Sequence, residues 1–376
     1  MKLALQVGRL GFQGGLERHA YDLGRALRGR GHEVRLLHGE ETGRDAALFS
    51  AAFSQVFALG APGALRGLDA VWVEKARSLD DLSALGDLPV VLAVHDHDLT
   101  CARTARLRPP LRGPCHRAPG VSCLLTCALV RERRPGALPL RLVNALSLPG
   151  RLRALARRGQ LIACSSYLAR TLVEAGAPAE RVSVLHPVPP EPAQPMQPRP
   201  RERRLLVAAQ LVHGKGVDLA IHALRFLPDD ISLNVVGDGP DRARLERLAL
   251  PFGRRVKFDG YVPAERMQAM YDSCRAALVP SRWPEPFGLC GVEAMRRARP
   301  AVGAAHGGIL EWLAPGAGFV PENVHDLARA ALEALDDDTA GDRSLGFVRT
   351  RFPEGGAVQA AESALAAAAS SSTAAP

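Results

Sequence analysis

A proline-rich stretch from His186 to Arg204 divides the chain into two halves and limits what it can fold into. Prolines occupy positions 187, 189, 190, 192, 195, 198 and 200, and the stretch has no hydrophobic period. Proline at this density cannot continue a helix or a central strand, because its ring fixes φ and it has no amide hydrogen to donate. We therefore expect a flexible, extended linker over residues 187–204, and 376 residues are enough for two domains beside it.

Short apolar runs alternate with helical segments on both sides of this stretch. Before it, strands are expected at residues 3–7, 34–37, 71–73, 90–94 and 161–163. After it, they are expected at residues 205–208, 233–236, 256–258, 276–279 and 301–303. Helices fit between them, for example from residue 16 to 27, and from Asp218 as N-cap to Leu227. Continuous apolar strands that alternate with helices are typical of parallel sheets covered on both faces.

The sequence therefore predicts an α/β protein of two Rossmann-like, doubly wound domains, over residues 1–186 and 205–345. Ligands bind at the carboxyl ends of the strands in such sheets, so we expect the two domains to face a cleft. Residues 346–376 are expected to form a helix that returns to the first domain. The alanine-, serine- and threonine-rich end, Ala366–Pro376, is expected to fray.

The formal net charge of +9 has two interpretations. It reflects either an arginine- and alanine-rich composition or a partner with phosphates or an anionic membrane face. The arginine-rich segment Arg151–Arg158 is either a solvated helix face or a docking surface for such a partner. Nucleic acid is not expected, since the basic residues lack interleaved aromatic side chains. No apolar run approaches the roughly 20 residues that span a bilayer, and the start gives no export signal, so we expect a cytoplasmic protein.

The strongest chemical signal is the segment from Glu285 to Glu293, in which Gly288 and Gly291 lie between the two glutamates. A predicted strand precedes this segment and a predicted helix follows it. The free N–H groups at a helix start make an anion site. Carboxylates beside such a site fit hydroxyl-rich ligands such as sugar or ribose, although a loop charge and an ordinary helix acid give the same pattern.

Two glycine-containing turns follow other strands of the second half. In the first, Lys215 stands between Gly214 and Gly216 at the predicted start of a helix, which suits a phosphate contact or a plain surface turn. In the second, residues 237–240 read Gly-Asp-Gly-Pro and permit a tight turn.

In this order and spacing, these elements resemble the family-four retaining glycosyltransferases of GT-B fold (glycosyl transferases group 1). The loop Gly14–His19 and the segment Gly31–Val34 belong to the same pattern. The resemblance runs from about residue 3 to 320 and is poorer between residues 101 and 148. It implies transfer of a hexose-type sugar from a UDP- or GDP-linked donor to a saccharide, lipid-linked or cell-surface glycan acceptor. It also implies that catalysis needs no cofactor.

By that resemblance, Lys215 neutralises the donor diphosphate, Glu293 binds the ribose hydroxyls and Glu285 contacts the transferred sugar. His95, which follows the predicted strand at residues 90–94, matches a family histidine near the reacting centre. The other donor-binding positions are Gly14, Gly15, Gln210, Gly237, Asp238, Phe287, Gly288 and Leu289.

One position departs from the family pattern. Most members have an arginine where this chain has Gln210, and arginine would give a permanently charged, bidentate phosphate contact. We expect either another cation, Arg282 or His213, to compensate, or diphosphate binding to be weaker. The departure keeps two alternatives open: an inactive sugar-nucleotide-binding or scaffold protein, and a GT-B sugar-nucleotide epimerase.

Four of the seven cysteines crowd into an insert at about residues 95–127, namely Cys101, Cys115, Cys123 and Cys127. Four thiolates satisfy tetrahedral zinc, but the gaps are irregular and no Cys-x-x-Cys pair occurs. Structural zinc, reduced thiols and redox pairing therefore all stay open.

Overall fold

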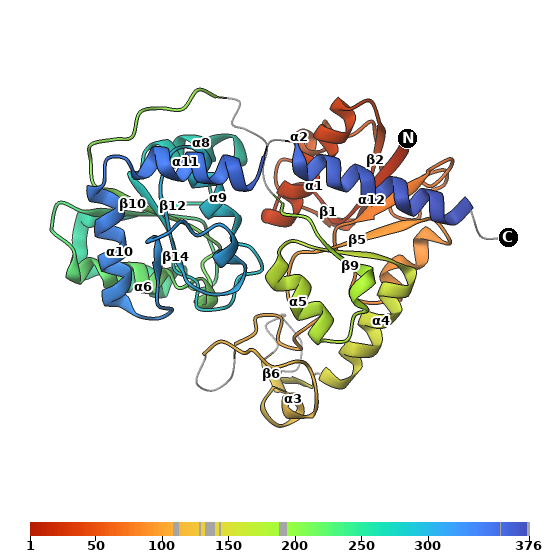
Figure 1. Ribbon diagram of the computed structural model, residues 1–376, viewed down its shortest axis with the longest axis horizontal. Helices are drawn as coiled ribbons and strands as arrows, with labels where there is room; N and C mark the ends of the chain where they lie inside the picture. Colours follow the sequence, from red (N-terminus) through yellow and green to blue (C-terminus); the bar gives the residue numbers. More distant parts are fainter. Residues whose placement is uncertain are drawn as a thin grey trace. The chain divides into compact units, whose positions relative to one another are not determined.

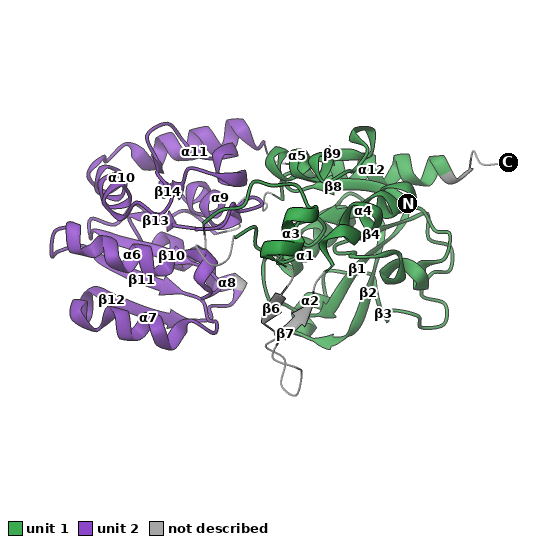
Figure 2. Cartoon of the chain, turned by 90° about the horizontal axis from the view of Figure 1, so that it is seen from below, with its two compact units in different colours: residues 1–187, 355–376 green, residues 188–354 purple. Residues whose placement is uncertain are grey.

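The computed structural model describes residues 1–107, 113–127, 129–131, 140–142, 144–187, 194–353 and 355–373. The chain forms two compact units: residues 1–187 together with 355–376, and residues 188–354 (Figure 2). Unit 1 and unit 2 below refer to these two parts.

Unit 1 is built on a parallel sheet of seven strands in the order β3-β2-β1-β4-β5-β8-β9. Every residue of β4 and β5 is buried, so the centre of the sheet is covered on both faces. The strands are β1 (Lys2–Leu10), β2 (Glu33–Thr42), β3 (Gln55–Ala58), β4 (Ala70–Val73), β5 (Val90–Val94), β8 (Gly159–Ala163) and β9 (Val182–Val184). The strands β6 (Leu129–Arg131) and β7 (Leu140–Leu142) form a separate antiparallel pair.

The helices of unit 1 include one from the far end of the chain. The α-helices are α1 (Gly15–Gly29), α2 (Ala46–Ser50), α3 (Val121–Thr126), α4 (Leu148–Arg158), α5 (Ser166–Glu174) and α12 (Gly356–Thr373). The 3-10 helices are η1 (Leu79–Leu85), η2 (Ala145–Ser147) and η3 (Ala179–Arg181).

Helix α12 contacts α1, β4 and β5 (Figure 1). Its side chains Ala361 and Leu365 are fully buried in the core of unit 1, and Glu362 pairs with Arg30 and His32, each at 2.7 Å. The segment from Ala366 that was expected to fray is helical up to Thr373. Alanine is the strongest helix former, and the apolar face of α12 is anchored on the sheet.

Unit 2 is built on a parallel sheet of six strands in the order β12-β11-β10-β13-β14-β15. The strands are β10 (Arg204–Ala208), β11 (Ser232–Val236), β12 (Val256–Gly260), β13 (Ala276–Val279), β14 (Ala301–Ala304) and β15 (Gly318–Phe319). The α-helices are α6 (Val217–Ala223), α7 (Arg242–Ala249), α8 (Ala264–Asp272), α9 (Leu289–Arg296), α10 (Val324–Asp336) and α11 (Ala340–Arg351). The 3-10 helices are η4 (His213–Lys215), η5 (Leu224–Phe226), η6 (Leu250–Arg255) and η7 (Gly307–Glu311).

Both sheets confirm the predicted α/β class of doubly wound, Rossmann-like sheets. Three short edge strands, β3, β9 and β15, were not predicted. Unit 2 also ends later than the expected residue 345, because α11 packs against α9. Helix α6 begins at Val217 after the N-cap Gly216, so Asp218 is not the N-cap. The carboxylate of Asp218 instead pairs with Arg282 at 2.5 Å.

The described part of the linker is bound to unit 2 rather than flexible. The guanidinium of Arg297 donates to the carbonyl oxygens of Gln194 and Pro195 at 2.7 and 2.9 Å. That of Arg299, which is fully buried, donates to Gln197 and Pro198 at 3.0 and 3.2 Å. A proline-rich segment forms few backbone ladders, so arginine side chains satisfy its carbonyl groups.

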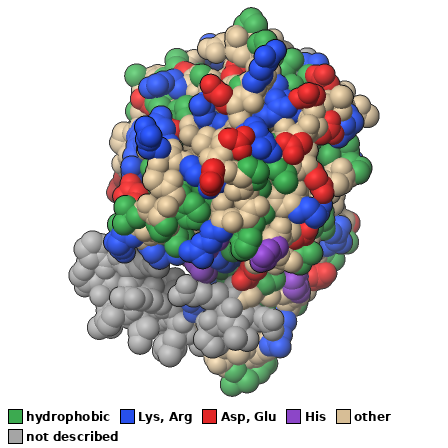
Figure 3. Space-filling view, turned by 90° about the vertical axis from the view of Figure 1, so that its left-hand side faces the viewer, with side chains coloured by type: hydrophobic (Ala, Val, Ile, Leu, Met, Phe, Trp, Pro, Cys, Tyr) green, Lys and Arg blue, Asp and Glu red, His purple; other side chains and the backbone are tan. Residues whose placement is uncertain are grey.

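The surface charge and the lengths of the apolar helices bear on the expected partners. On the face drawn in Figure 3, basic and acidic side chains are interspersed, so the net positive charge is not gathered into one patch there. Among the described residues, no helix combines the length and apolar character that crossing a membrane requires.

Candidate functional site

In both sheets the strand order reverses beside the first strand, between β1 and β4 in unit 1 and between β10 and β13 in unit 2. The loops that leave the strands at such a point diverge, and ligands bind there. The loop of Lys215 follows β10 and that of Glu285 follows β13. His95 follows β5, the neighbour of β4. The topology therefore places Lys215 and Glu285 at the switch point of unit 2, and His95 one strand away from that of unit 1.

The predicted cation and one predicted carboxylate of unit 2 form an ion pair. Lys215 Nζ lies 2.6 Å from Glu285 Oε1, and Ser281 Oγ donates to the same oxygen at 2.5 Å. The ammonium group also lies 5.2 Å from the centre of the Trp283 ring. Burial alone would raise the pKa of Glu285, which is 4% exposed, but the charge and hydrogen bond of Lys215 and the Ser281 hydroxyl lower it. Glu285 is therefore a buried, ionised carboxylate.

Two glycines make this arrangement possible. Gly216 has a φ of +65°, and a Cβ there would lie 1.8 Å from the carbonyl oxygen of Pro280. Gly237 has a φ of +124°, and its Cβ would lie 1.9 Å from the carbonyl oxygen of Ala209. Only glycine permits both the positive φ and the close approach of two backbones. The loops after β10, β11 and β13 are thus held against one another by their backbones.

The loop that carries Glu285 leads into α9, which begins after the N-cap Gly288 at a φ of +84°. Hydrogen bonds fix this loop: the amide of Gly308 donates to the carbonyl of Glu285 at 2.7 Å, and the Trp312 indole donates to the carbonyl of Phe287 at 2.6 Å. Phe287 is itself buried, and Leu289 is the first residue of the helix. The N-terminus of α9 therefore has a fixed direction.

Glu293 lies further along α9, and the hydroxyl of Tyr271 donates to its Oε2 at 2.7 Å. Burial and the charge of Glu293 raise the pKa of Tyr271 well above its usual value, so the phenol stays a donor. The charges of Lys215, Glu285 and Glu293 all act on the thiol of Cys290. Burial first of all raises the pKa of its thiol to about 12. All three predicted groups thus act electrostatically on one neutral thiol.

Other predicted donor positions differ in how they are held. Gln210 is exposed, and Asp238 is exposed and accepts from the amide of Gly239 at 2.8 Å. Arg282, one expected substitute for the missing arginine, is buried and donates to both carboxylate oxygens of Asp218 at 2.5 and 3.1 Å. Its charge is therefore already balanced inside unit 2.

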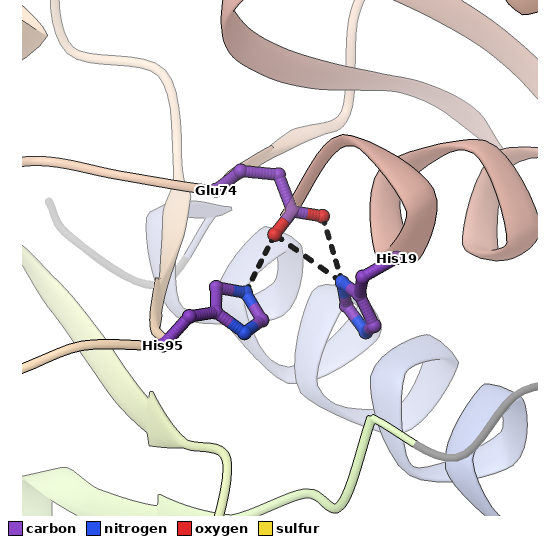
Figure 4. Close-up of side chains that lie close together, drawn as sticks. All are labelled: His19, Glu74 and His95. Atoms are coloured by element: carbon purple, nitrogen blue, oxygen red, sulfur yellow. Dashed lines mark hydrogen bonds and ion pairs between the residues drawn. The ribbon is translucent and has the colours of Figure 1, made fainter. Parts of the chain in front are cut away.

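In unit 1, His95 belongs to a cluster that the sequence did not reveal (Figure 4). Its Nε2 lies 2.7 Å from Oε2 of Glu74, and His19 Nδ1 lies 3.0 Å from Oε1 of the same carboxylate. Burial would raise the pKa of Glu74, but the charges and hydrogen bonds of the two histidines lower it to about 2. Burial would lower the pKa of His19, but Glu74 outweighs it and the pKa is raised. The sequence offers one signal for this cluster, since Glu74 directly follows a buried strand.

The first loop of unit 1 contains the predicted glycines. Gly14 is the extended N-cap of α1 and its amide donates to Oε2 of Glu17 at 3.0 Å, while Gly14 and Gly15 are both exposed. An added Cβ would meet no atom within 4 Å at Gly15 and only Glu17 Oε2, at 3.9 Å, at Gly14. Within unit 1 itself, neither glycine is needed for close packing.

Among the described residues, His19, Glu74 and His95 are the one group of three potential ligands whose atoms lie within 4.8 Å of one another. Within the described part of the chain, no three of the four insert cysteines meet that distance. The buried guanidinium of Arg106 instead holds the insert, donating to the carbonyls of Cys115 and Arg117 at 2.8 and 3.3 Å. Zinc on these cysteines stays a prediction.

The fold and these loops define a two-unit α/β protein with polar switch-point sites of the kind that bind phosphorylated ligands. Two family patterns match the chain: Glycosyltransferase Family 4 over residues 13–188 and Glycosyl transferases group 1 over residues 193–345. The chain belongs to the family-four glycosyltransferases of GT-B fold.

Similar proteins of known sequence agree with this assignment. D-inositol 3-phosphate glycosyltransferase 1 of Catenulispora acidiphila is 30% identical over 291 residues, which cover 69% of this chain and 66% of that protein. Glycogen synthase of Mycobacterium tuberculosis is 32% identical over 42% of this chain and 39% of its own length. An uncharacterized glycosyltransferase of Methanocaldococcus jannaschii is 29% identical over 36% of each chain. The matches with the latter two thus span well under half of those proteins.

Solved structures show the same fold. Anabaena HepE, crystallised with UDP and glucose, has a TM-score of 0.71 at 19% identity, covering 98% of this chain and all of that one. WaaG, a glycosyltransferase involved in lipopolysaccharide biosynthesis, has a TM-score of 0.67 at 18% identity, covering 96% and 99%. At these identities the likeness establishes the GT-B fold.

Proposed function

We propose that the protein is a retaining glycosyltransferase that moves a hexose-type sugar from a UDP- or GDP-linked donor to a saccharide, lipid-linked or cell-surface glycan acceptor. The observation that carries this proposal is the ion pair of Lys215 and Glu285 at the switch point of unit 2, with Glu293 on the helix that begins beside it. The UDP complex of the structurally similar HepE supports a nucleotide donor.

Breaking a glycosyl–phosphate bond leaves negative charge on the departing diphosphate, and the protein's main task is to stabilise that charge. In our proposal Lys215 turns from Glu285 to the diphosphate, and the amides of Phe287 and Gly288 at the start of α9 add further donors. Loss of one such donor typically costs about 2.7–4 kcal/mol in the transition state. Glu285, released from the lysine, then accepts hydrogen bonds from hydroxyls of the sugar.

Glu293 is proposed to bind the ribose hydroxyls, with Tyr271 fixing the direction of its carboxylate. His95 is proposed to act at the reacting centre, and Gly14 and Gly15 to present an open backbone to the donor. The absence of close packing at both glycines within unit 1 supports a ligand-related reason for their small size.

A panel of UDP, GDP, ADP and CMP in thermal unfolding tests the donor site. A ligand at about 100 times its Kd stabilises the folded state by about 2.7 kcal/mol, which is enough to detect. We expect one diphosphate to raise Tm for the wild type, and Glu293→Gln to remove the shift. Glu265→Gln, an exposed glutamate on α8 of the same unit, is the matched control. Equal shifts in wild type and Glu293→Gln would refute the ribose assignment.

An inactive nucleotide-sugar-binding or scaffold protein is the second candidate. It is favoured by the exposed Gln210 and by Arg282, whose charge Asp218 already balances. A diphosphate shift without sugar transfer to any acceptor would support this candidate. Conversion of the donor sugar to its epimer without an acceptor, followed by proton NMR, would instead identify the epimerase alternative.

We also propose that unit 1 binds an anionic membrane surface, as a lipid-linked acceptor would require. Helix α3 exposes Val121 and Leu125 at 69% and 86%, and the neighbouring η2 exposes Leu146 at 49%. Helix α4, which follows η2 directly, exposes Arg153 and Arg157. Exposed apolar side chains on α3 and η2, together with basic ones on α4, fit a bilayer interface with anionic lipid better than they fit water.

A further inference from the structure

The proposed role of His95 leaves one buried carboxylate unexplained. Glu74 directly follows β4, is 1% exposed, and lies between two imidazole rings from other elements (Figure 4). Burying an ionised carboxylate is costly unless it is paired and hydrogen-bonded. Both oxygens of Glu74 are used: Oε1 by His19 on α1 and Oε2 by His95 after β5.

The geometry dictates which nitrogens carry protons. An ionised carboxylate only accepts hydrogen bonds, so His19 Nδ1 and His95 Nε2 must each carry a hydrogen. For His95 this selects one tautomer and leaves Nδ1 at the other side of the ring. Without Glu74, either nitrogen of the ring could carry the proton.

The charges around Glu74 favour an ionised carboxylate beside His19. Burial lowers the pKa of His19, but Glu74 and, further off, Asp22 outweigh it, and the pKa is raised. The contact with Glu74 thus favours the charged form of His19 beside the buried carboxylate. The charge of Asp96, the residue after His95, is balanced by an ion pair with Lys75. Glu74 acts on His95 through the hydrogen bond between its Oε2 and Nε2 of the ring.

We propose that Glu74 is a positioning residue: its Oε2 fixes the ring and the tautomer of His95, and the contact of its Oε1 with His19 holds the carboxylate in place. The expected effect on sugar transfer rests on the proposed function, whereas the expected tautomer of His95 does not. Because His19 lies on α1 and His95 follows β5, Glu74 also ties the first helix of unit 1 to the loop of the proposed catalytic histidine. The same three groups meet the distances of a metal site, but two hydrogen bonds already satisfy the carboxylate.

The test is histidine-selective nitrogen NMR on the full chain, with Glu74→Asp, Glu74→Gln and Glu74→Ala, and the spectra of His95→Asn and His19→Asn as assignments. We expect neutral His95 of the wild type to hold its proton on Nε2, and Glu74→Ala to show a mixture of both tautomers. Glu74→Asp should restore part of the wild-type pattern. Circular dichroism and Tm establish that each variant is folded.

Sugar transfer provides the second readout. We expect Glu74→Ala to lower kcat about 10- to 100-fold, the range typical for loss of a carboxylate that orients a metal-bound histidine, with little change in the donor KM. Glu74→Asp should recover part of kcat. A folded Glu74→Ala that keeps the Nε2 tautomer overturns the proposal, as does wild-type binding of Zn²⁺ that these variants abolish. If the wild type transfers no sugar yet shows the expected tautomers, the proposed function fails while the positioning role stands.

Discussion

Lys215 Nζ and Glu285 Oε1 lie 2.6 Å apart, so the cation proposed to receive the diphosphate is neutralised by the carboxylate proposed to receive the sugar. The pair keeps a buried carboxylate satisfied while no donor is bound. A diphosphate must therefore compete with Glu285 for Lys215. Because of this competition, substitutions at the two residues should change the affinity for the diphosphate in opposite directions.

We expect Glu285→Gln to bind free UDP or GDP more tightly than the wild type, because Lys215 loses its internal counter-ion. The same variant should transfer sugar at least about 100-fold more slowly, since a positioned hydrogen-bonding group at the reacting centre is lost. Isothermal titration with the free diphosphate and a radiolabelled transfer assay measure the two effects. Weaker diphosphate binding in Glu285→Gln would contradict the competition.

Lys215→Ala should weaken diphosphate binding and also destabilise unit 2. Removing one partner of a fully buried pair costs about 3–5 kcal/mol, and we expect a loss nearer 2 kcal/mol because the Lys215 side chain is 25% exposed. Urea unfolding measures the loss. The double variant Lys215→Ala/Glu285→Gln should recover much of it, because no unpaired buried charge is left.

The cluster of Glu74 and His19 predicts a pH optimum of stability for unit 1. The pKa of Glu74 is lowered from 4.5 to about 2, so its contribution is full above pH 4.5 and is lost as the pH falls toward 2. The pKa of His19 is raised above 6.5, so its contribution is full below pH 6.5 and is lost as the pH rises through the raised value. Both contributions are complete between pH 4.5 and 6.5.

Urea unfolding at a series of pH values, in wild type and Glu74→Gln, checks this window. In Glu74→Gln the pKa of His19 should fall, because the main cause that raises it is removed, and the difference in stability between the two proteins should be largest inside the window. A difference that does not change with pH would show that the two groups do not form an ion pair.

Gly216→Ala should destabilise unit 2 by more than the cost of its positive φ alone. At Gly253, where φ is +53° and no atom lies within 4 Å of an added Cβ, alanine should cost only about 1–2 kcal/mol. At Gly216 the same φ cost is joined by a clash with the carbonyl oxygen of Pro280 at 1.8 Å. Comparison of the two variants by thermal unfolding isolates the close approach. Equal losses would mean that the two loops are not in contact.

Val121→Ser/Leu125→Ser should reduce binding to vesicles that contain anionic phosphatidylglycerol. Each apolar side chain withdrawn from the interface removes stabilisation in proportion to its buried area. Leu250→Ser, at a side chain that is 75% exposed on η6 of unit 2, is the matched control. Vesicle co-sedimentation measures the effect, and equal loss in both variants would argue against a surface specific to α3.

Much of the architecture could be predicted from the local pattern of apolar residues. Parallel strands buried on both faces appear as short apolar runs, so the central strands were located, although β1 and β2 run three and five residues beyond their expected ends. The edge strands β3, β9 and β15 were missed because a partly exposed short strand has no such run. The N-cap of α6 was misplaced because Asp218 is a common capping residue, and the pairing that takes its carboxylate comes from Arg282, 64 positions away.

The sequence by itself determined the family and the two-sheet plan, because apolar strands and the glycines, lysine and glutamates at fixed spacing carry that information locally. Only the tertiary structure decided which groups meet. It paired Lys215 with Glu285 and Arg282 with Asp218. It also placed the carboxylate of Glu74 between His19 and His95. The physical reason is that the pKa and charge of a buried group depend on neighbours brought together by the sheet order, which no local pattern specifies.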